Sequence, residues 1–77
     1  MATDEDIVTA AVDAAESVVF SRYSRSEIRD LDVTVRYESG DLEVDVYLNV
    51  PDDADSEQVA DDAALAARSA VDDLLES

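Results

Sequence analysis

The sequence predicts an α+β domain of helix-hairpin-helix (αββα) order, with both helices packed on one face of a two-stranded antiparallel sheet. Three observations predict it: an apolar stripe of helical period towards each end of the chain, two strictly alternating runs between them, and the single glycine at the junction of those runs. With 77 residues, the chain is expected to form one domain, residues 1–77, near the lower size limit for folding without disulfides or metal.

The first predicted element is an amphipathic helix that begins after Thr3 and ends near residues 20–22. Thr3 is a favourable N-cap, and the acidic residues after it suit the positive end of the helix dipole. Apolar residues then follow in two adjacent rows at helical spacing: Ile7, Ala11, Ala14 and Val18, and beside them Val8, Val12, Ala15 and Val19. The helix is expected to end there because Arg22 would fall in the middle of this stripe.

The two alternating runs predict a β-hairpin with a fixed register. The apolar residues that share one face are Leu31, Val33, Val35 and Tyr37 in the first run and Leu42, Val44, Val46, Leu48 and Val50 in the second. Ser39 and Gly40 lie between the runs, and a glycine suits the positive φ of a tight hairpin loop. A two-residue loop keeps every apolar residue on one face and places Arg36 opposite Glu43, whereas a one-residue slip would expose half of the apolar set.

Capping patterns flank the hairpin on both sides. Ser24, with Glu27 three residues later, has the form of a capping box and predicts a short helical turn through Arg29. Pro51 ends the second strand, and Asp55 is the expected N-cap of a final helix. The apolar stripe of that helix is Val59, Ala63, Ala66, Ala70 and Leu74, flanked by Ala60, Ala67 and Val71.

Charge is the strongest signal in the chain. Twenty-one acidic residues face five arginines and no lysine, which gives a formal net charge of −16. In dilute buffer this self-repulsion opposes compaction, but at about 1 M salt the Debye length falls to about 3 Å and the repulsion is largely screened. Intrinsic disorder is the rival interpretation, and an apolar fraction of 47% with regular periodicity argues against it. We therefore expect a halophilic globular protein.

The chain contains neither cysteine nor histidine. The lack of cysteine and histidine excludes disulfides, cysteine–histidine zinc sites, thiol nucleophiles and imidazole bases. Asp41, Glu43 and Asp45 share one strand face, but in so acidic a chain we expect them to form a solvated surface rather than a cation site. We expect neither enzymatic activity nor a cofactor. The acidic N-terminus and the lack of an apolar run of about 18 residues predict a cytoplasmic protein with no membrane segment.

The segment from Arg22 to Arg36 departs from the acidic background. It holds four arginines and three acidic residues, whereas the other sixty-two residues hold one arginine and eighteen acidic residues. Arg22, Arg25 and Arg29 recur at helical spacing, so one interpretation is a docking patch for an acidic protein or a phosphate backbone, to which Phe20 adds apolar area. The other interpretation is that these cations complement a helix C-terminus and bridge to nearby acids.

The small size of the expected sheet favours a second copy of the chain that would complete it. A two-stranded sheet is marginal alone and leaves two unpaired edges. Two large apolar residues, Phe20 and Leu65, also fall on the polar sides of their helices. We expect a homodimer that joins sheet edges into four strands or covers these residues. The alternative is that they are single exposed hydrophobes, which are common on monomers.

Three segments carry a resemblance to a known family: residues 18–23 (VVFSRY), 27–35 (EIRDLDVTV) and 42–46 (LEVDV), followed by an alanine-rich closing helix. Together they resemble the uncharacterised archaeal domain of unknown function family 3194 over nearly the whole chain. The resemblance implies no site residues, because the family has no assigned activity. Its members tend to be encoded near a prefoldin subunit and components of translation or transcription, which favours an interaction protein over an enzyme.

These observations predict a non-enzymatic protein-interaction module, expected to be a homodimer, that serves protein folding or information processing in a salt-rich archaeal cytoplasm. The candidate partner contacts are Phe20, Arg22, Arg25, Arg29 and Arg36. The alternative is an accessory RNA- or tRNA-associated protein that uses the same arginines. Nucleic-acid binding is not favoured, because so few arginines give only a shallow electrostatic attraction that molar salt nearly erases.

Overall fold

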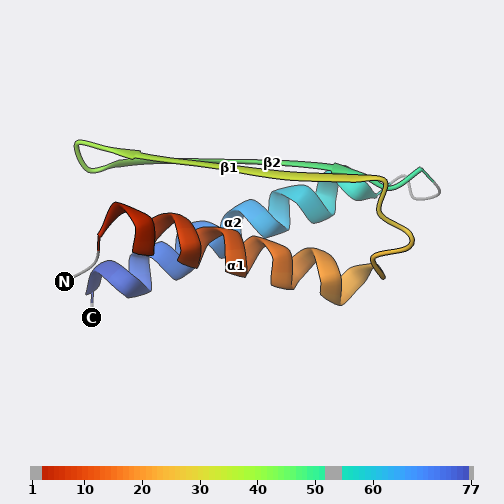
Figure 1. Cartoon of the computed structure of the whole chain (residues 1–77), viewed down its shortest axis with the longest axis horizontal. Coiled ribbons are helices and arrows are strands. Elements are labelled where there is room, and N and C mark those ends of the chain that lie inside the picture. Colours follow the sequence, from red (N-terminus) through yellow and green to blue (C-terminus); the bar gives the residue numbers. More distant parts are fainter. Residues whose placement is uncertain (1–2, 52–54, 77) are drawn as a thin grey trace.

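A computed structural model describes residues 3–51 and 55–76 of the chain. Its elements are α1 (Asp4–Arg22), β1 (Asp30–Glu38), β2 (Asp41–Asn49) and α2 (Ser56–Glu76). The strands form an antiparallel hairpin, and both helices lie side by side against one of its faces, α1 next to β1 and α2 next to β2 (Figure 1). The predicted αββα order and the packing of both helices on one face of the sheet are confirmed.

The first helix begins and ends where the sequence predicts. The Thr3 hydroxyl accepts a hydrogen bond from the backbone N–H of Asp6, and the Asp6 carboxylate accepts one from the Thr3 N–H, both at 3.1 Å. This capping box satisfies two N–H groups that a helix start otherwise leaves unpaired. At the other end, Tyr23 is extended while its N–H still donates to the Val19 carbonyl at 3.0 Å. The side chain of Tyr23 is buried, so the chain turns from the helix towards the sheet.

The connection between α1 and β1 differs from the prediction. The Ser24 backbone N–H and hydroxyl both donate to the Glu27 carboxylate, at 3.1 and 3.0 Å, so the expected capping pair forms. Only a turn follows at residues 25–27, and the predicted helical turn through Arg29 is wrong. The reason is that the Arg29 N–H donates to the Asn49 carbonyl at 2.8 Å, which draws the chain into the end of the sheet.

The hairpin has the predicted register throughout. The pairs end with Glu38 opposite Asp41, next to the turn, and the alternating apolar residues of both strands all point towards the helices. Ser39 and Gly40 join the strands with φ values of 52° and 86°. Two successive positive φ values are typical of a type I′ turn, whose twist matches that of paired strands.

The core is a thin layer of mostly small apolar side chains. Its buried residues are Ile7, Ala11, Ala15 and Val19 of α1, then Tyr23, Val44, Leu48 and Val50, and finally Val59, Ala63, Ala67 and Val71 of α2. In each helix the buried residues form one row of i, i+4 spacing, which is the row along which packed helices interdigitate. The sequence placed Ala14, Val18, Ala66 and Ala70 in the central rows. These four are half-buried, because the fully buried row of each helix is the neighbouring one.

The two large apolar residues expected on polar helix faces have different environments. Leu65 is exposed as expected, with 66% of its surface accessible. Phe20 is half-buried and packs against the core near the end of α1. The apolar area expected at Phe20 is therefore partly covered within the single chain.

The turn conformation generates a prediction about stability. We expect Gly40→Ala to destabilise the domain by about 1 kcal/mol, because a Cβ atom is unfavourable at positive φ. Ser39→Asn should stabilise it by about 0.5 kcal/mol, because Asn-Gly is the preferred pair of a type I′ turn. Urea unfolding of both variants in molar KCl measures these changes. An unaltered midpoint for Gly40→Ala would contradict the turn assignment.

The net charge of −16 and the thin core generate a second prediction. We expect the free energy of unfolding to rise with KCl concentration up to about 1 M, because screening weakens the repulsion among carboxylates. Thermal unfolding in a graded KCl series measures the effect. Equal melting temperatures in nearly salt-free water and in molar KCl would show that repulsion does not limit the stability of this fold.

Candidate functional site

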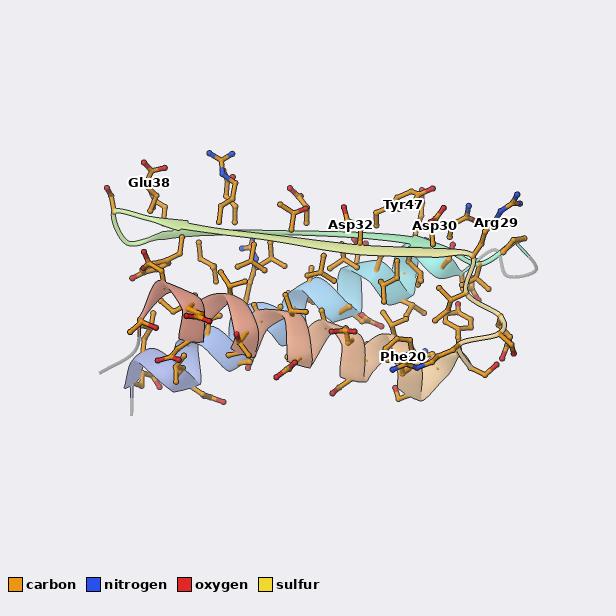
Figure 2. The ribbon with its side chains drawn as sticks, in the orientation of Figure 1. Phe20, Arg29, Asp30, Asp32, Glu38 and Tyr47 are labelled. Atoms are coloured by element: carbon orange, nitrogen blue, oxygen red, sulfur yellow. The ribbon has the colours of Figure 1, made fainter. Side chains whose placement is uncertain are left out.

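Within the described residues, no element covers the face of the hairpin that points away from the helices. We call it the outer sheet face. It comprises Asp30, Asp32, Thr34, Arg36 and Glu38 of β1 and Asp41, Glu43, Asp45, Tyr47 and Asn49 of β2. All of these residues are exposed except Asn49, which is half-buried. Figure 2 shows Glu38, Asp32 and Tyr47 projecting away from the helix layer. Because six of these side chains are carboxylates and one is a guanidinium, the face is strongly anionic.

Tyr47 is the aromatic residue of the outer sheet face, and 56% of its surface is exposed. It lies opposite Asp32 in the register, and Asp45 and Asn49 flank it along β2 on the same face. Strand periodicity dictates this orientation, because the residues on either side of Tyr47 point inward. An exposed ring among carboxylates offers a binding partner apolar contact area, a hydroxyl group and negative charge together.

Arg36 is the cation of the outer sheet face, and it pairs with Glu43 across the hairpin at 3.7 Å, as the register predicts. The two side chains are 69% and 68% exposed, so the pair contributes little to stability. With Glu38 and Asp41 they border a shallow hollow beside the turn.

Three of the five predicted contact residues lie where α1 meets the connection to β1. The Arg22 guanidinium forms an ion pair with Asp62 of α2 at 3.6 Å. The Arg25 guanidinium lies over the ring of Phe20, 4.8 Å from its centroid, in a cation–π contact. The Arg22 pair fits the interpretation that these cations bridge to nearby acids and complement the helix end, whereas Arg25 contacts an aromatic ring.

The other two predicted contact residues, Arg29 and Arg36, lie on the sheet. Arg29 precedes β1, and Figure 2 shows its side chain near Asp30 at one end of the hairpin. Arg36 lies towards the turn. Its Cα is about 23 Å from that of Arg29, because a strand rises about 3.3 Å per residue. The helical spacing of the arginines is not realised, because α1 ends at Arg22. The structure therefore does not gather the four guanidinium groups on one surface.

A groove lies beside part of each sheet edge, towards the end of the hairpin that is away from the turn. The larger, which we call the β2-edge groove, is lined by Val46, Tyr47, Leu48 and Asn49 of β2 and by Ser56, Glu57, Ala60 and Asp61 of α2. The smaller lies between α1 and β1 and is lined by Val12, Glu16, Leu31 and Val33. Sequence reasoning identified the unpaired edges but missed both grooves, because these depend on how far each helix extends beyond its strand.

Two features of the described residues bear on the chemistry. Within residues 3–51 and 55–76, no group of three or more acidic side chains is placed to hold a metal ion. Neither of the two described helices contains an apolar stretch long enough to cross a bilayer.

Two helices beneath one uncovered hairpin, with a groove at each sheet edge, define a small two-layer αββα protein. The chain belongs to the family described as "Protein of unknown function (DUF3194)", which it matches over residues 3–74, so the resemblance inferred from the sequence is confirmed. An uncharacterised protein of Natronomonas pharaonis is 57% identical over 74 residues, which cover 96% of this chain and 89% of that protein.

Two solved structures are similar to this fold. A crystal structure from Thermococcus onnurineus NA1 matches with a TM-score of 0.75 and 28% identity, covering 99% of this chain and 82% of that one. The solution structure of the hypothetical protein mth677 from Methanothermobacter thermautotrophicus matches with a TM-score of 0.73 and 26% identity, covering 99% of this chain and 91% of that one. The arrangement therefore persists when most residues differ.

The contact between Arg25 and Phe20 generates a prediction about the structural role of the arginines. A double-mutant cycle of Arg25→Ala and Phe20→Leu should give a coupling of about 0.5–1 kcal/mol in unfolding, as expected for an exposed cation–π pair. The matched cycle of Arg36→Ala and Glu43→Ala should give about 0–0.5 kcal/mol, because both partners are exposed and salt screens the pair. Urea unfolding in molar KCl measures both. A coupling at Arg36–Glu43 as large as that at Arg25–Phe20 would contradict this ranking.

Proposed function

We propose that this chain is a non-enzymatic protein-interaction module that binds a positively charged protein surface through its outer sheet face. The observation that carries the proposal is that an entire face of the hairpin, rich in carboxylates and with Tyr47 exposed, has no covering element within the described part of the chain. Exposed aromatic residues in polar surroundings are frequent anchors of protein interfaces.

Tyr47 supplies the apolar anchor of this surface. Covering its ring removes apolar surface from water, which stabilises a complex by about 25 cal/mol per Å². The side chain has few rotatable bonds, so fixing it in an interface costs little conformational entropy. Its neighbours Asp32, Asp45 and Asn49 form the polar rim that surrounds such an anchor in protein complexes.

The carboxylates of the outer sheet face determine the charge of the partner. An acidic surface placed against them would bring like charges together, which is unfavourable. A surface with arginine or lysine instead forms charge-assisted hydrogen bonds to the carboxylates, and arginine does so with two parallel bonds. Arg29 and Arg36, towards the two ends of β1, would pair with acidic groups at the margin of the same partner.

We place this module in a salt-rich archaeal cytoplasm, where it would serve protein folding or information processing. The net charge of −16 supports the salt-rich setting, because high ionic strength makes such a surface tolerable. The genomic association of the family with a prefoldin subunit and with components of translation or transcription supports the proposed role.

RNA association through the Arg22 to Arg36 segment has less support from the geometry. Arg22 pairs with Asp62, and Arg25 lies over Phe20, so both would have to leave a contact within the chain to meet a phosphate group. The adjoining outer sheet face would also repel a phosphate backbone.

The proposal predicts that partners are retained by the outer sheet face. We expect the variant Asp32→Asn/Asp45→Asn/Tyr47→Ala to lose the proteins that the wild-type chain captures from a lysate in molar KCl, because it removes the anchor and two neighbouring charges. Direct titration with each captured protein after purification measures the loss, which we expect to be at least about tenfold in affinity. Leu65→Ser is the matched control, because it removes an exposed apolar side chain from α2 and should leave affinity unchanged.

A second variant, Arg22→Ala/Arg25→Ala/Arg29→Ala, tests the alternative contact surface. Loss of the same proteins from this variant, with the outer-face variant still binding them, would place the contact in the arginine segment and refute the proposal. Titrations at graded KCl separate protein from RNA ligands. RNA affinity should fall steeply with salt, whereas a protein contact anchored by an apolar side chain should persist.

A further inference from the structure

The β2-edge groove exists because two helices are wider than two strands. Neighbouring strands lie about 4.8 Å apart, whereas packed helices lie about 8–10 Å apart and each is about 10 Å across. α2 therefore extends sideways beyond β2, beneath the position that a third strand would occupy. Glu57, Ala60 and Asp61 of α2 line the groove on one side, and Val46 and Leu48 of β2 line it on the other.

The backbone along this groove has hydrogen-bonding groups that the hairpin does not use. In an antiparallel hairpin, alternate residues bond to the partner strand, and the residues between them point N–H and C=O groups towards the outer edge. A two-residue turn closes the hairpin with the bonded pair Glu38–Asp41. The outward groups on β2 therefore belong to the residues with inward side chains, which are Leu42, Val44, Val46 and Leu48.

We propose that the β2-edge groove binds an extended segment of a partner protein, as a third strand, in which apolar and basic residues alternate. The inference rests on the proposed interaction function and names the part of the partner that is recognised. The inward side chains of the segment lie between β2 and α2, against Val46 and Ala60. Where the segment continues beyond the groove towards the turn, its outward side chains stand beside Asp45 and Glu43 on the outer sheet face, at the spacing of about 5 Å at which opposite charges pair across strands. The two-residue period of a strand thus requires apolar and basic residues to alternate in the partner segment, and the carboxylates require the basic residues to be positively charged.

A second copy of this chain fits the same edge poorly. Antiparallel pairing about a two-fold axis keeps both helix layers on the same side of the joined sheet. Two copies of α2, each extending beyond its own β2, would then meet in the same space when the strands approach to about 4.8 Å. A bare segment brings no helix with it. The predicted homodimer stays a prediction, and joining β2 edges is an unfavourable way to form it.

The other sheet edge is the weaker candidate and therefore the natural control. Its groove is smaller and has fewer lining residues than the β2-edge groove. The outward side chains of β1 include Arg36 between Thr34 and Glu38, so a basic segment meets a mixed charge pattern there. The outward side chains of β2 near the turn are all acidic, from Asp41 to Asp45.

The probe is a fluorescent synthetic peptide of alternating valine and arginine, about eight residues long, which matches the usual length of a strand. The control peptide has the same composition, but its valines form one block and its arginines form a second block after it. Titration with the full chain in molar KCl is followed by fluorescence anisotropy. We expect the block peptide to bind at least about tenfold more weakly, because only alternation presents one apolar and one basic face.

Two substitutions test the location of the bound peptide. Ala60→Arg fills the β2-edge groove, and Val12→Arg is the matched substitution in the groove beside β1. Ala60→Arg should weaken binding at least about tenfold, whereas Val12→Arg should change it by no more than about twofold. In the wild-type chain, the peptide should slow amide exchange at Val44 and Val46, a readout that does not depend on how well the variants fold.

The outcomes separate this inference from the proposed function. No binding of the alternating peptide, or binding that Ala60→Arg leaves unchanged without slowed exchange along β2, would overturn the inference. If Tyr47→Ala abolishes such binding while Ala60→Arg leaves it unchanged and exchange along β2 is not slowed, the contact lies on the outer sheet face, so the inference is wrong and the proposed function stands without strand addition. If light scattering in molar KCl shows a dimer that Ala60→Arg dissociates, the groove holds a second copy and the inference is wrong.

Discussion

The width of a helix relative to a strand is the constraint on which this architecture depends. Two packed helices span about 16–20 Å, whereas a two-stranded ribbon is about half as wide, so each helix underlies its strand only in part. Alanine reduces this mismatch in width, because small side chains allow close packing and the buried rows of both helices contain Ala11, Ala15, Ala63 and Ala67. The Cα extents of 41 × 19 × 17 Å fit a body two helices wide and two layers thick. The uncovered outer sheet face and the grooves at both sheet edges follow from this geometry.

The same small residues that narrow the helix layer leave little apolar surface to bury. The largest fully buried side chains are Ile7, Val19 and Val71, so the favourable burial term is modest for a chain with a net charge of −16. The Arg22–Asp62 and Arg36–Glu43 ion pairs add little, because in each of them at least one side chain is more than half exposed. High ionic strength would therefore stabilise this fold mainly by weakening an unfavourable repulsion. The dependence of stability on salt would then arise from the thinness of the core.

The sequence predicted the features that nearby residues determine, and it did not predict those that depend on tertiary contacts. The hairpin register was predictable because alternation over both strands and a two-residue loop containing Gly40 allow one pairing that keeps every apolar residue inside. The start of α1 was predictable because Thr3 and Asp6 form a capping box within one turn. The path of Arg29 was not, because its N–H bonds to Asn49, which is distant in sequence. The stacking of Arg25 on Phe20 also depends on the turn that replaces the predicted helix. The spacing of the arginines therefore suggested a single patch, whereas in the structure they lie apart.

Recognition in a concentrated salt solution favours contacts that ions do not screen. At about 1 M salt, charges farther apart than about 3 Å interact weakly, so the carboxylates of the outer sheet face would guide an approaching partner only slightly. Backbone hydrogen bonds at the β2 edge and apolar contact with Val46 and Tyr47 do not weaken with ionic strength in this way. A partner segment would therefore be positioned first by the strand edge, and charge would discriminate only at bonding distance, where Glu43 and Asp45 accept hydrogen bonds from a cation. In a chain whose surface is acidic almost everywhere, the carboxylates that confer specificity in the proposed complex would then be those that stand beside an open strand edge.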